Sequence, residues 1–141
     1  MKRRLVLAAF LLYCTVMLWL LFGQRLGAPG EASLNLRPFE TIRRFWWVLQ
    51  NSHQLGMVTH AVINLAGNVV MFVPLGLLLP AVWSSLRRFW LWLGSVTGVI
   101  LMVELVQLAT RLGACDVDDV ILNLLGAFLG DGLWWLFYRK M

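Results

Sequence analysis

The stretch of sequence that decides the fold runs from Leu5 to Phe22 and reads LVLAAFLLYCTVMLWLLF, eighteen residues without a charge. As a helix it spans about 27 Å, close to the thickness of the hydrocarbon core of a bilayer. Three basic residues precede it, as in a signal peptide, but the apolar core of a cleaved signal is usually only about 7–15 residues long. We therefore predict an uncleaved membrane span, although Gly27 and Ala28 offer a faint cleavage-like context.

Three more apolar stretches follow, separated by polar linkers, at Ala61–Trp83, Phe89–Ala109 and Val120–Tyr138. Each is long enough to cross a bilayer, and inside lipid a helix satisfies all its own backbone hydrogen bonds. Hydrophobic residues make up 60% of the chain and charged residues 13%, which leaves too few charges to coat a soluble globule. The sequence thus predicts an all-α integral membrane bundle of four transmembrane helices, as a single domain over residues 1–141.

The net charge of +5 comes from 12 basic residues that are scattered over the membrane flanks, a distribution that argues against nucleic-acid binding. Cytoplasmic loops of membrane proteins carry an excess of Lys and Arg. With the N-terminus inside, the cytoplasmic side holds seven basic residues, Lys2, Arg3, Arg4, Arg87, Arg88, Arg139 and Lys140, and the other side holds five, Arg25, Arg37, Arg43, Arg44 and Arg111. We expect both termini in the cytoplasm and one long extracytoplasmic loop between helices 1 and 2.

This loop, from Gly23 to about His60, mixes arginines with large aromatic side chains in its 40–50 segment. Such a segment either lies in the membrane interface as a short amphipathic helix or folds back between the spanning helices to cap a cavity. The two cysteines, Cys14 in an apolar run and Cys115 in a polar linker, give neither a disulfide framework nor the spacing of a metal site. We interpret Cys14 as a small buried apolar residue.

Polar residues recur along one face of each of the last three spans, where every polar group is costly. The three sets are His60, Asn64 and Asn68; Glu104, Gln107 and Arg111; and Asp119 with Asn123, after Asp116 and Asp118. In the expected topology they all lie in the outer half of the membrane at a similar depth. We predict that they form a shared, outward-facing polar pocket, which the loop at Arg37, Pro38 and Phe39 covers.

Simpler interpretations exist for several of these residues. The amide side chains also serve as glue between membrane helices, at about 0.6–2 kcal/mol each. Asp116 has the position of a helix N-cap, with Asp118 and Asp119 in the first turn, where the helix dipole favours acidic groups. Glu104 lies about 7 Å inside the end of its helix, so it must pair, take up a proton or bind a ligand. His60 has no acidic orienting partner in the sequence and is a weak candidate for a base.

Glycine and proline positions give further expectations for packing. Gly126 and Gly130 form a small-xxx-small pair, which allows a neighbouring helix to approach closely. Pro74 interrupts the backbone hydrogen bonds of the second span and is expected to kink it. Asp131 lies deep in the last span, where it either snorkels toward the membrane surface, meets an arginine from the other loop, or sits at a contact between copies of the chain.

Several separate motifs, in order, resemble the VanZ-like family over residues 35 to 130. They are Asn35–Phe39 with Thr41 and Ile42, Asn64–Asn68 with Phe72–Gly76 and Pro80, Glu104–Gln107 with Arg111, and Asp116–Asn123 with Gly126. The resemblance points to Arg37, Pro38, Asn64, Asn68, Glu104, Gln107, Arg111, Asp118, Asp119 and Asn123 as functional positions. The chain departs from the family pattern at Leu124 and at Asp131.

The resemblance implies a small multi-pass protein of the bacterial cytoplasmic membrane, with a motif-bearing part at about 35–138. The name-giving member of the family is linked to teicoplanin resistance. We expect the pocket to handle an amphipathic ligand: a lipid headgroup, a lipid-linked wall precursor or a lipophilic glycopeptide. Arg37 and Arg111 would engage its phosphate or carboxylate groups. Besides the lipid bilayer and this ligand, a second copy of the chain is a possible partner.

An enzyme is the alternative. Glu104 and Asp119 are then candidates for an acid/base pair acting on an envelope lipid, and Asp118 and Asp119 are weak candidates for holding Mg²⁺. No serine, cysteine or histidine arrangement suggests a covalent nucleophile. We expect no cofactor and no resident metal ion.

Overall fold

The computed structural model of the chain describes residues 2–23 and 33–138. Its elements, in chain order, are α1 (Lys2–Phe22), β1 (Ser33–Asn35), α2 (Glu40–Asn51), α3 (Leu55–Val82), the short 3-10 helix η2 (Ser84–Arg87), α4 (Phe89–Thr110), β2 (Ala114–Asp116) and α5 (Val117–Tyr138). Arg25, Arg139 and Lys140, which entered the topology prediction, and the Gly27–Ala28 context lie outside the described residues.

The four predicted spans are confirmed as α1, α3, α4 and α5, each long and apolar enough to cross a membrane. Between 6% and 33% of the most apolar window of each span is buried inside the protein. Large hydrophobic side chains therefore cover the outside of the bundle, as expected for a surface that meets lipid tails.

The predicted long loop between the first two spans is not confirmed, although a short amphipathic helix in its 40–50 segment was one of the two alternatives. This region contains β1 and α2, and α3 begins at Leu55, six residues earlier than the predicted start at Ala61. The hydropathy pattern misses this start because Thr59 and His60 dilute the apolar character of the first turns of α3.

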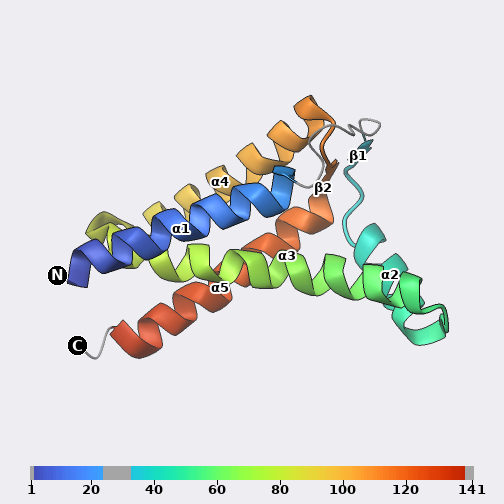
Figure 1. Cartoon of the computed structure of the whole chain (residues 1–141), viewed down its shortest axis with the longest axis horizontal. Helices are drawn as coiled ribbons and strands as arrows, with labels where there is room; N and C mark the ends of the chain where they lie inside the picture. Colours follow the sequence, from blue (N-terminus) through green and yellow to red (C-terminus); the bar gives the residue numbers. More distant parts are fainter. Residues whose placement is uncertain (1, 24–32, 139–141) are drawn as a thin grey trace.

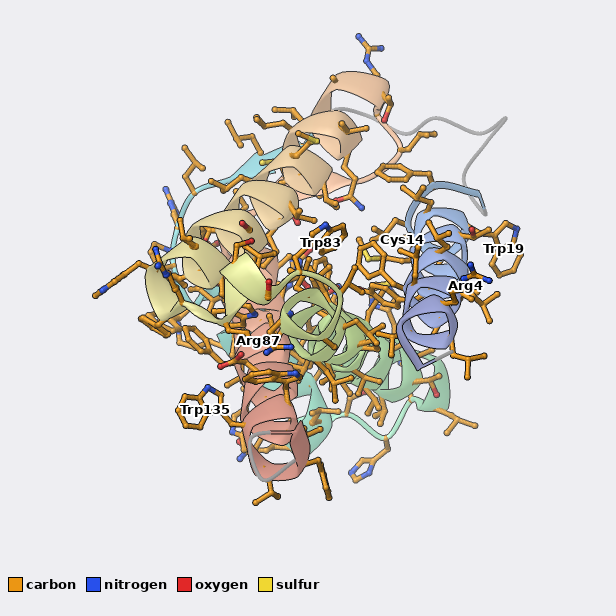
Figure 2. The ribbon with its side chains drawn as sticks, turned by 90° about the vertical axis from the view of Figure 1, so that its left-hand side faces the viewer. Arg4, Cys14, Trp19, Trp83, Arg87 and Trp135 are labelled. Atoms are coloured by element: carbon orange, nitrogen blue, oxygen red, sulfur yellow. The ribbon has the colours of Figure 1, made fainter. Side chains whose placement is uncertain are left out.

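Consecutive spans run in opposite directions along the bundle (Figure 1). α1 begins and α5 ends at one end of the bundle, whereas β1, β2 and α2 gather at the opposite end (Figure 1). The first of these ends also carries η2, and Figure 2 looks onto it, with Arg4 on α1 and Arg87 in view. The two ends of the bundle therefore differ in structure: the start of α1, the end of α5 and η2 lie at one end, and the strands with α2 lie at the other.

Three glycines let α3 and α5 cross in close contact. A Cβ on Gly126 would lie 2.0 Å from the carbonyl oxygen of Val69, and a Cβ on Gly130 would lie 2.0 Å from that of Val73. From the other side, a Cβ on Gly76 would lie 1.9 Å from the carbonyl oxygen of Ala127. The prediction that Gly126 and Gly130 permit a close helix approach is confirmed, because no side chain fits at these positions.

Pro74 and Pro80 both lie inside α3, which continues through them as one helix. Pro80 has no N–H, so the carbonyl of Gly76, four residues earlier, loses its helical partner. The indole Nε1 of Trp92 on α4 donates a hydrogen bond to this carbonyl at 3.3 Å. Trp92 is buried at the centre of the apolar core together with Phe72, Val96 and Ile100, so the bond lies where water has no access.

The 40–51 segment is an amphipathic helix that packs on the first turns of α3. Phe45 and Val48 are buried against Ala61, with Leu49 and Leu65 beside them. Trp46 and Trp47 are exposed on the other face. The segment is thus a helix on the side of the bundle end rather than a loop threaded between the spans (Figure 1).

Candidate functional site

A two-stranded parallel sheet fixes the long connection against the linker between α4 and α5. β1 pairs with β2 so that Asn35 lies opposite Asp116. The side chain of Asn35 donates to both carboxylate oxygens of Asp116 at 3.3 Å, and its own Oδ1 accepts the N–H of Arg37 at 3.1 Å. Residues about eighty positions apart in the chain therefore meet at the start of α5.

Asp116 joins three elements through its carboxylate. The hydroxyl of Thr41 on α2 donates to it at 2.6 Å, and the N–H of Asp118 donates to it at 2.9 Å. The second contact is that of an N-cap residue, two positions before the donor, and it confirms the N-cap interpretation of Asp116 for α5. Asp116 is buried, so these bonds replace its hydration.

Asp118 caps a helix other than its own. Its Oδ1 accepts the N–H of Phe39 at 2.5 Å and its Oδ2 accepts the N–H of Ile42 at 3.0 Å, both at the N-terminus of α2. Phe39 itself has a left-handed backbone with φ 64° and offers no side-chain cap. Asp118 is 0% exposed, and both of its oxygens accept backbone amides of α2. Its negative charge also lies at the N-terminus of α2, where the helix dipole interacts favourably with it.

Glu104 reaches the same region from α4. Its Oε2 accepts the N–H of Asp116 at 3.1 Å, and its side chain is 2% exposed. Asp116 and Asp119 lie near enough for their charges to act on it. Gln107, one turn further along α4, is also buried. The third span therefore contributes to the cluster at the predicted position.

A hydrogen bond between α3 and α5 completes the group. The amide of Asn68 donates to Asp119 Oδ1 at 2.6 Å. One turn away on each helix, the side-chain carbonyls of Asn64 and Asn123 are buried, and neither has a hydrogen-bond partner among the described residues. Asn123 is 2% exposed. We call Asn64, Asn68, Glu104, Asp119 and Asn123 the polar cluster.

Other predicted residues lie at the rim or elsewhere. The side chain of Arg37 is 85% exposed and lies 3.9 Å from Glu40. Arg111 is exposed and ends α4 in a left-handed conformation, with φ 58°. His60 is exposed, with its ring 5.5 Å from that of Phe45. Asp131 is half-buried, about 18 Å along α5 from Asp119 at the helical rise.

Sequence reasoning gave no site role to Asn35 and Thr41, although both belong to the family motifs. Each acts through Asp116 from an element that hydropathy does not reveal. Within residues 2–23 and 33–138, no three or more His, Cys, Asp or Glu side chains are grouped so that they could hold a metal ion. Asp118 and Asp119, the weak metal candidates, have different partners, the α2 amides and Asn68.

Cys115 reports on the electrostatics of this end of the bundle. It lies in β2, outside the spans, and is a free thiol. Partial burial raises the pKa of its thiol, and the carboxylates of Glu104, Asp116 and Asp119 raise it further. The thiol therefore lies within the electrostatic range of three carboxylates of this end of the bundle.

Comparison with known proteins identifies the family of this chain. A sequence model of the family described as VanZ/LLP1 matches residues 10–138. The chain belongs to the VanZ/LLP1 family. All of the polar cluster, Asp116, Asp118 and the α2 cap lie inside the region that the VanZ/LLP1 model matches.

A curated relative, Protein VanZ from Enterococcus faecium, is 31% identical over 114 residues, which cover 79% of this chain and 58% of the relative. The chain thus spans less than two thirds of the length of this VanZ protein. No solved structure matches the chain.

Proposed function

We propose that this chain is a multi-pass protein of the bacterial cytoplasmic membrane that binds an amphipathic envelope ligand at its polar cluster and contributes to resistance against teicoplanin-type glycopeptides. Membership in the VanZ/LLP1 family and the relative named VanZ support the link to resistance. The ligand is a lipid headgroup, a lipid-linked wall precursor or the glycopeptide itself.

The observation that carries the proposal is the pair of unpartnered carbonyls in Asn64 and Asn123. A buried polar atom without a hydrogen bond costs free energy, and it costs most inside a membrane, where water does not compensate. Cluster residues that acted only as glue between helices would be expected to satisfy one another. Acceptors left open beside Glu104 and Asp119 favour a site that receives a ligand.

The arrangement of polar and apolar residues along one face of α3 supports an amphipathic ligand. Asn64 and Asn68 share one face of α3 with Leu75 and Leu79, two to three turns deeper. These two leucines line an apolar cavity of about 450 Å³ between α1, α3 and α4. Cavities of a few hundred Å³ are typical of small-molecule sites. Figure 2 places Cys14, which also lines this cavity, on the side of α1 that faces the bundle, while Trp19 points away.

The charged residues support an outward-facing cluster. Arg4, Arg87 and Arg88 belong to the end of the bundle opposite α2, and short basic flanks favour the cytoplasm. The cluster end then faces the extracytoplasmic side, with exposed Trp46 and Trp47 at the level of the headgroups. Arg37 and Arg111 would meet phosphate or carboxylate groups of the ligand at the rim.

The experiment uses Arg37→Ala, Glu104→Gln and Asp119→Asn in a host where the wild-type chain confers teicoplanin resistance. Leu105→Ala is the matched control, since Leu105 follows Glu104 on α4 but is 62% exposed. We expect resistance to fall in the two cluster variants, and less in Arg37→Ala, with Leu105→Ala unchanged. Full resistance in all three variants at equal protein levels would refute the proposal.

An enzyme that acts on an envelope lipid is the second candidate. It is favoured by the proximity of two carboxylates, the buried Glu104 and the half-buried Asp119, an arrangement in which one acid can donate and the other accept a proton. Incubating the purified protein with total envelope lipids and recording their masses tests this candidate. A new product formed by wild type and not by Glu104→Gln would favour it over simple binding.

A further inference from the structure

We infer that the group recognised inside the polar cluster is a primary ammonium, which donates hydrogen bonds to the open amide carbonyls and is neutralised by the carboxylates. The inference rests on the proposed function, because it names the chemistry of the ligand for that same site. An aminophospholipid headgroup and a free amine share this chemistry.

The two open carbonyls lie on either side of Asp119 along the helices. α3 and α5 run parallel, and their close contacts join residues 57 positions apart at Gly126 and Gly130 and 51 positions apart at Gly76, so residues at the same level differ by about 54 positions. Asn64 is then level with about residue 118, and Asp119 lies between the levels of Asn64 and Asn123. The carbonyls of Asn64 and Asn123 therefore flank Asp119 rather than facing distant parts of the membrane.

Charge selects a cation over an anion. Glu104 is almost fully buried, and no described basic residue forms an ion pair with it. Arg37 pairs with Glu40 at the rim, and Arg111 is exposed. Arg43 and Arg44, on α2 at the cluster end, are exposed and contact the carbonyl of Phe39 and the ring of Phe45. Arg4, Arg87 and Arg88 belong to the far end of the bundle. A phosphate group placed among these acceptors would bring negative charge and further acceptors, which the cluster opposes.

Hydrogen-bond capacity selects a primary ammonium among cations. It carries one positive charge and three N–H donors. Two donors suit the carbonyls of Asn64 and Asn123, and the third suits a carboxylate. A quaternary ammonium has the same charge but no N–H, so it would leave both carbonyls open. This difference makes the inference testable with two lipids that differ only in methylation.

The test uses the full chain, purified and reconstituted in phosphatidylcholine nanodiscs. Equal fractions of phosphatidylethanolamine, its N,N-dimethyl derivative or phosphatidylglycerol are added, and lipids retained by the protein are counted by native mass spectrometry. Soluble ethanolamine, added as a competitor, distinguishes a free amine from a lipid headgroup. We expect phosphatidylethanolamine to be retained most, the dimethyl lipid less, and phosphatidylglycerol no more than phosphatidylcholine.

Variants connect the retained lipid to the cluster. Asn123→Leu removes one open carbonyl and is expected to weaken retention of phosphatidylethanolamine about fivefold. Asn123→Asp keeps an acceptor there and is expected to retain the lipid at least as well as wild type, which guards against a loss caused by misfolding alone. Asn51→Leu, on the exposed face of α2, is the control for removing an amide elsewhere.

Equal retention of the ethanolamine and choline lipids, or a preference for phosphatidylglycerol, would overturn the inference. Its failure is distinct from failure of the proposed function. If the cluster variants lose teicoplanin resistance while headgroup preference is absent, only the ammonium assignment is wrong. If phosphatidylethanolamine is preferred but resistance is unaffected by the variants, the site exists and the proposed role in resistance is wrong.

Discussion

The carboxylate of Asp118, at the start of α5, accepts the backbone N–H of Ile42 in α2 at 3.0 Å and that of Phe39 at 2.5 Å. Replacing Asp118 with Ala leaves these amides without a partner, and the loss of a cap costs about 0.5–2 kcal/mol. We expect hydrogen exchange at Phe39 and Ile42 to accelerate while α3 and α5 keep their protection. Asp118→Asn retains one acceptor and should show a smaller change. Unchanged exchange in Asp118→Ala would show that α2 is held by other contacts.

Gly126→Ala tests the crossing of α3 and α5. The added Cβ meets the carbonyl oxygen of Val69 at 2.0 Å, so the helices must separate, at a cost of about 1–3 kcal/mol or more. Gly67→Ala is the matched control, since a Cβ there meets nothing within 4 Å and Ala favours helix over Gly. Thermal unfolding in detergent should show a lower midpoint for Gly126→Ala and an equal or higher one for Gly67→Ala. Similar midpoints for the two variants would contradict the close crossing.

Cys115 allows the orientation to be measured. It lies in β2 at the cluster end, whereas Ser84 is exposed in η2 at the opposite end. In a Cys14→Ser background, a membrane-impermeant maleimide should label Cys115 in intact cells. With Cys115 also replaced by Ser, a cysteine introduced by Ser84→Cys should be labelled only after the membrane is opened. The reverse pattern would place the cluster on the cytoplasmic side.

The same thiol measures the charge of the cluster. Because burial and the carboxylates of Glu104, Asp116 and Asp119 raise the pKa of Cys115, little thiolate exists at neutral pH and labelling is slow. Glu104→Gln removes a negative charge, so the pKa of the Cys115 thiol should fall. Labelling at pH 7.5 should then accelerate about threefold for each half unit by which this pKa falls. Leu105→Gln is the control for a polar change on the lipid-facing side of α4. Equal labelling rates for wild type and Glu104→Gln would argue that Glu104 carries no charge near Cys115.

Features that depend on nearby residues in the sequence could be predicted, and contacts between residues far apart in the chain could not. The spans are predicted from local hydropathy. The close approach at Gly126 is predicted from the spacing of Gly126 and Gly130, and the N-cap role of Asp116 from its place at the start of a span. The meeting of Asn68 with Asp119 was also within reach, because costly polar residues at one depth must find partners. In contrast, Asn35 bonds Asp116 and Asp118 caps α2 across about eighty residues. Neither pairing leaves a periodic signal in the sequence.

The Trp92–Gly76 bond shows the same limit on a smaller scale. The sequence indicates that proline breaks a helical hydrogen bond, and Pro74 was the expected site of disturbance. The structure shows that the carbonyl freed by Pro80 is satisfied by an indole from α4. Only the packing of two helices decides which side chain reaches a freed carbonyl.

The most direct test of the account compares the stability and the function of Asn123→Leu. Asn123→Leu removes the buried side-chain carbonyl that has no partner, puts an apolar side chain of similar size in its place, and should stabilise the protein by about 1 kcal/mol or leave its stability unchanged. If the carbonyl serves a ligand, the same change should abolish most of the teicoplanin resistance conferred by the wild-type chain at equal expression. A variant that melts at or above the wild-type temperature and has lost resistance is the predicted result. A variant that is equally stable and still fully resistant would contradict the claim that the polar cluster is a binding site.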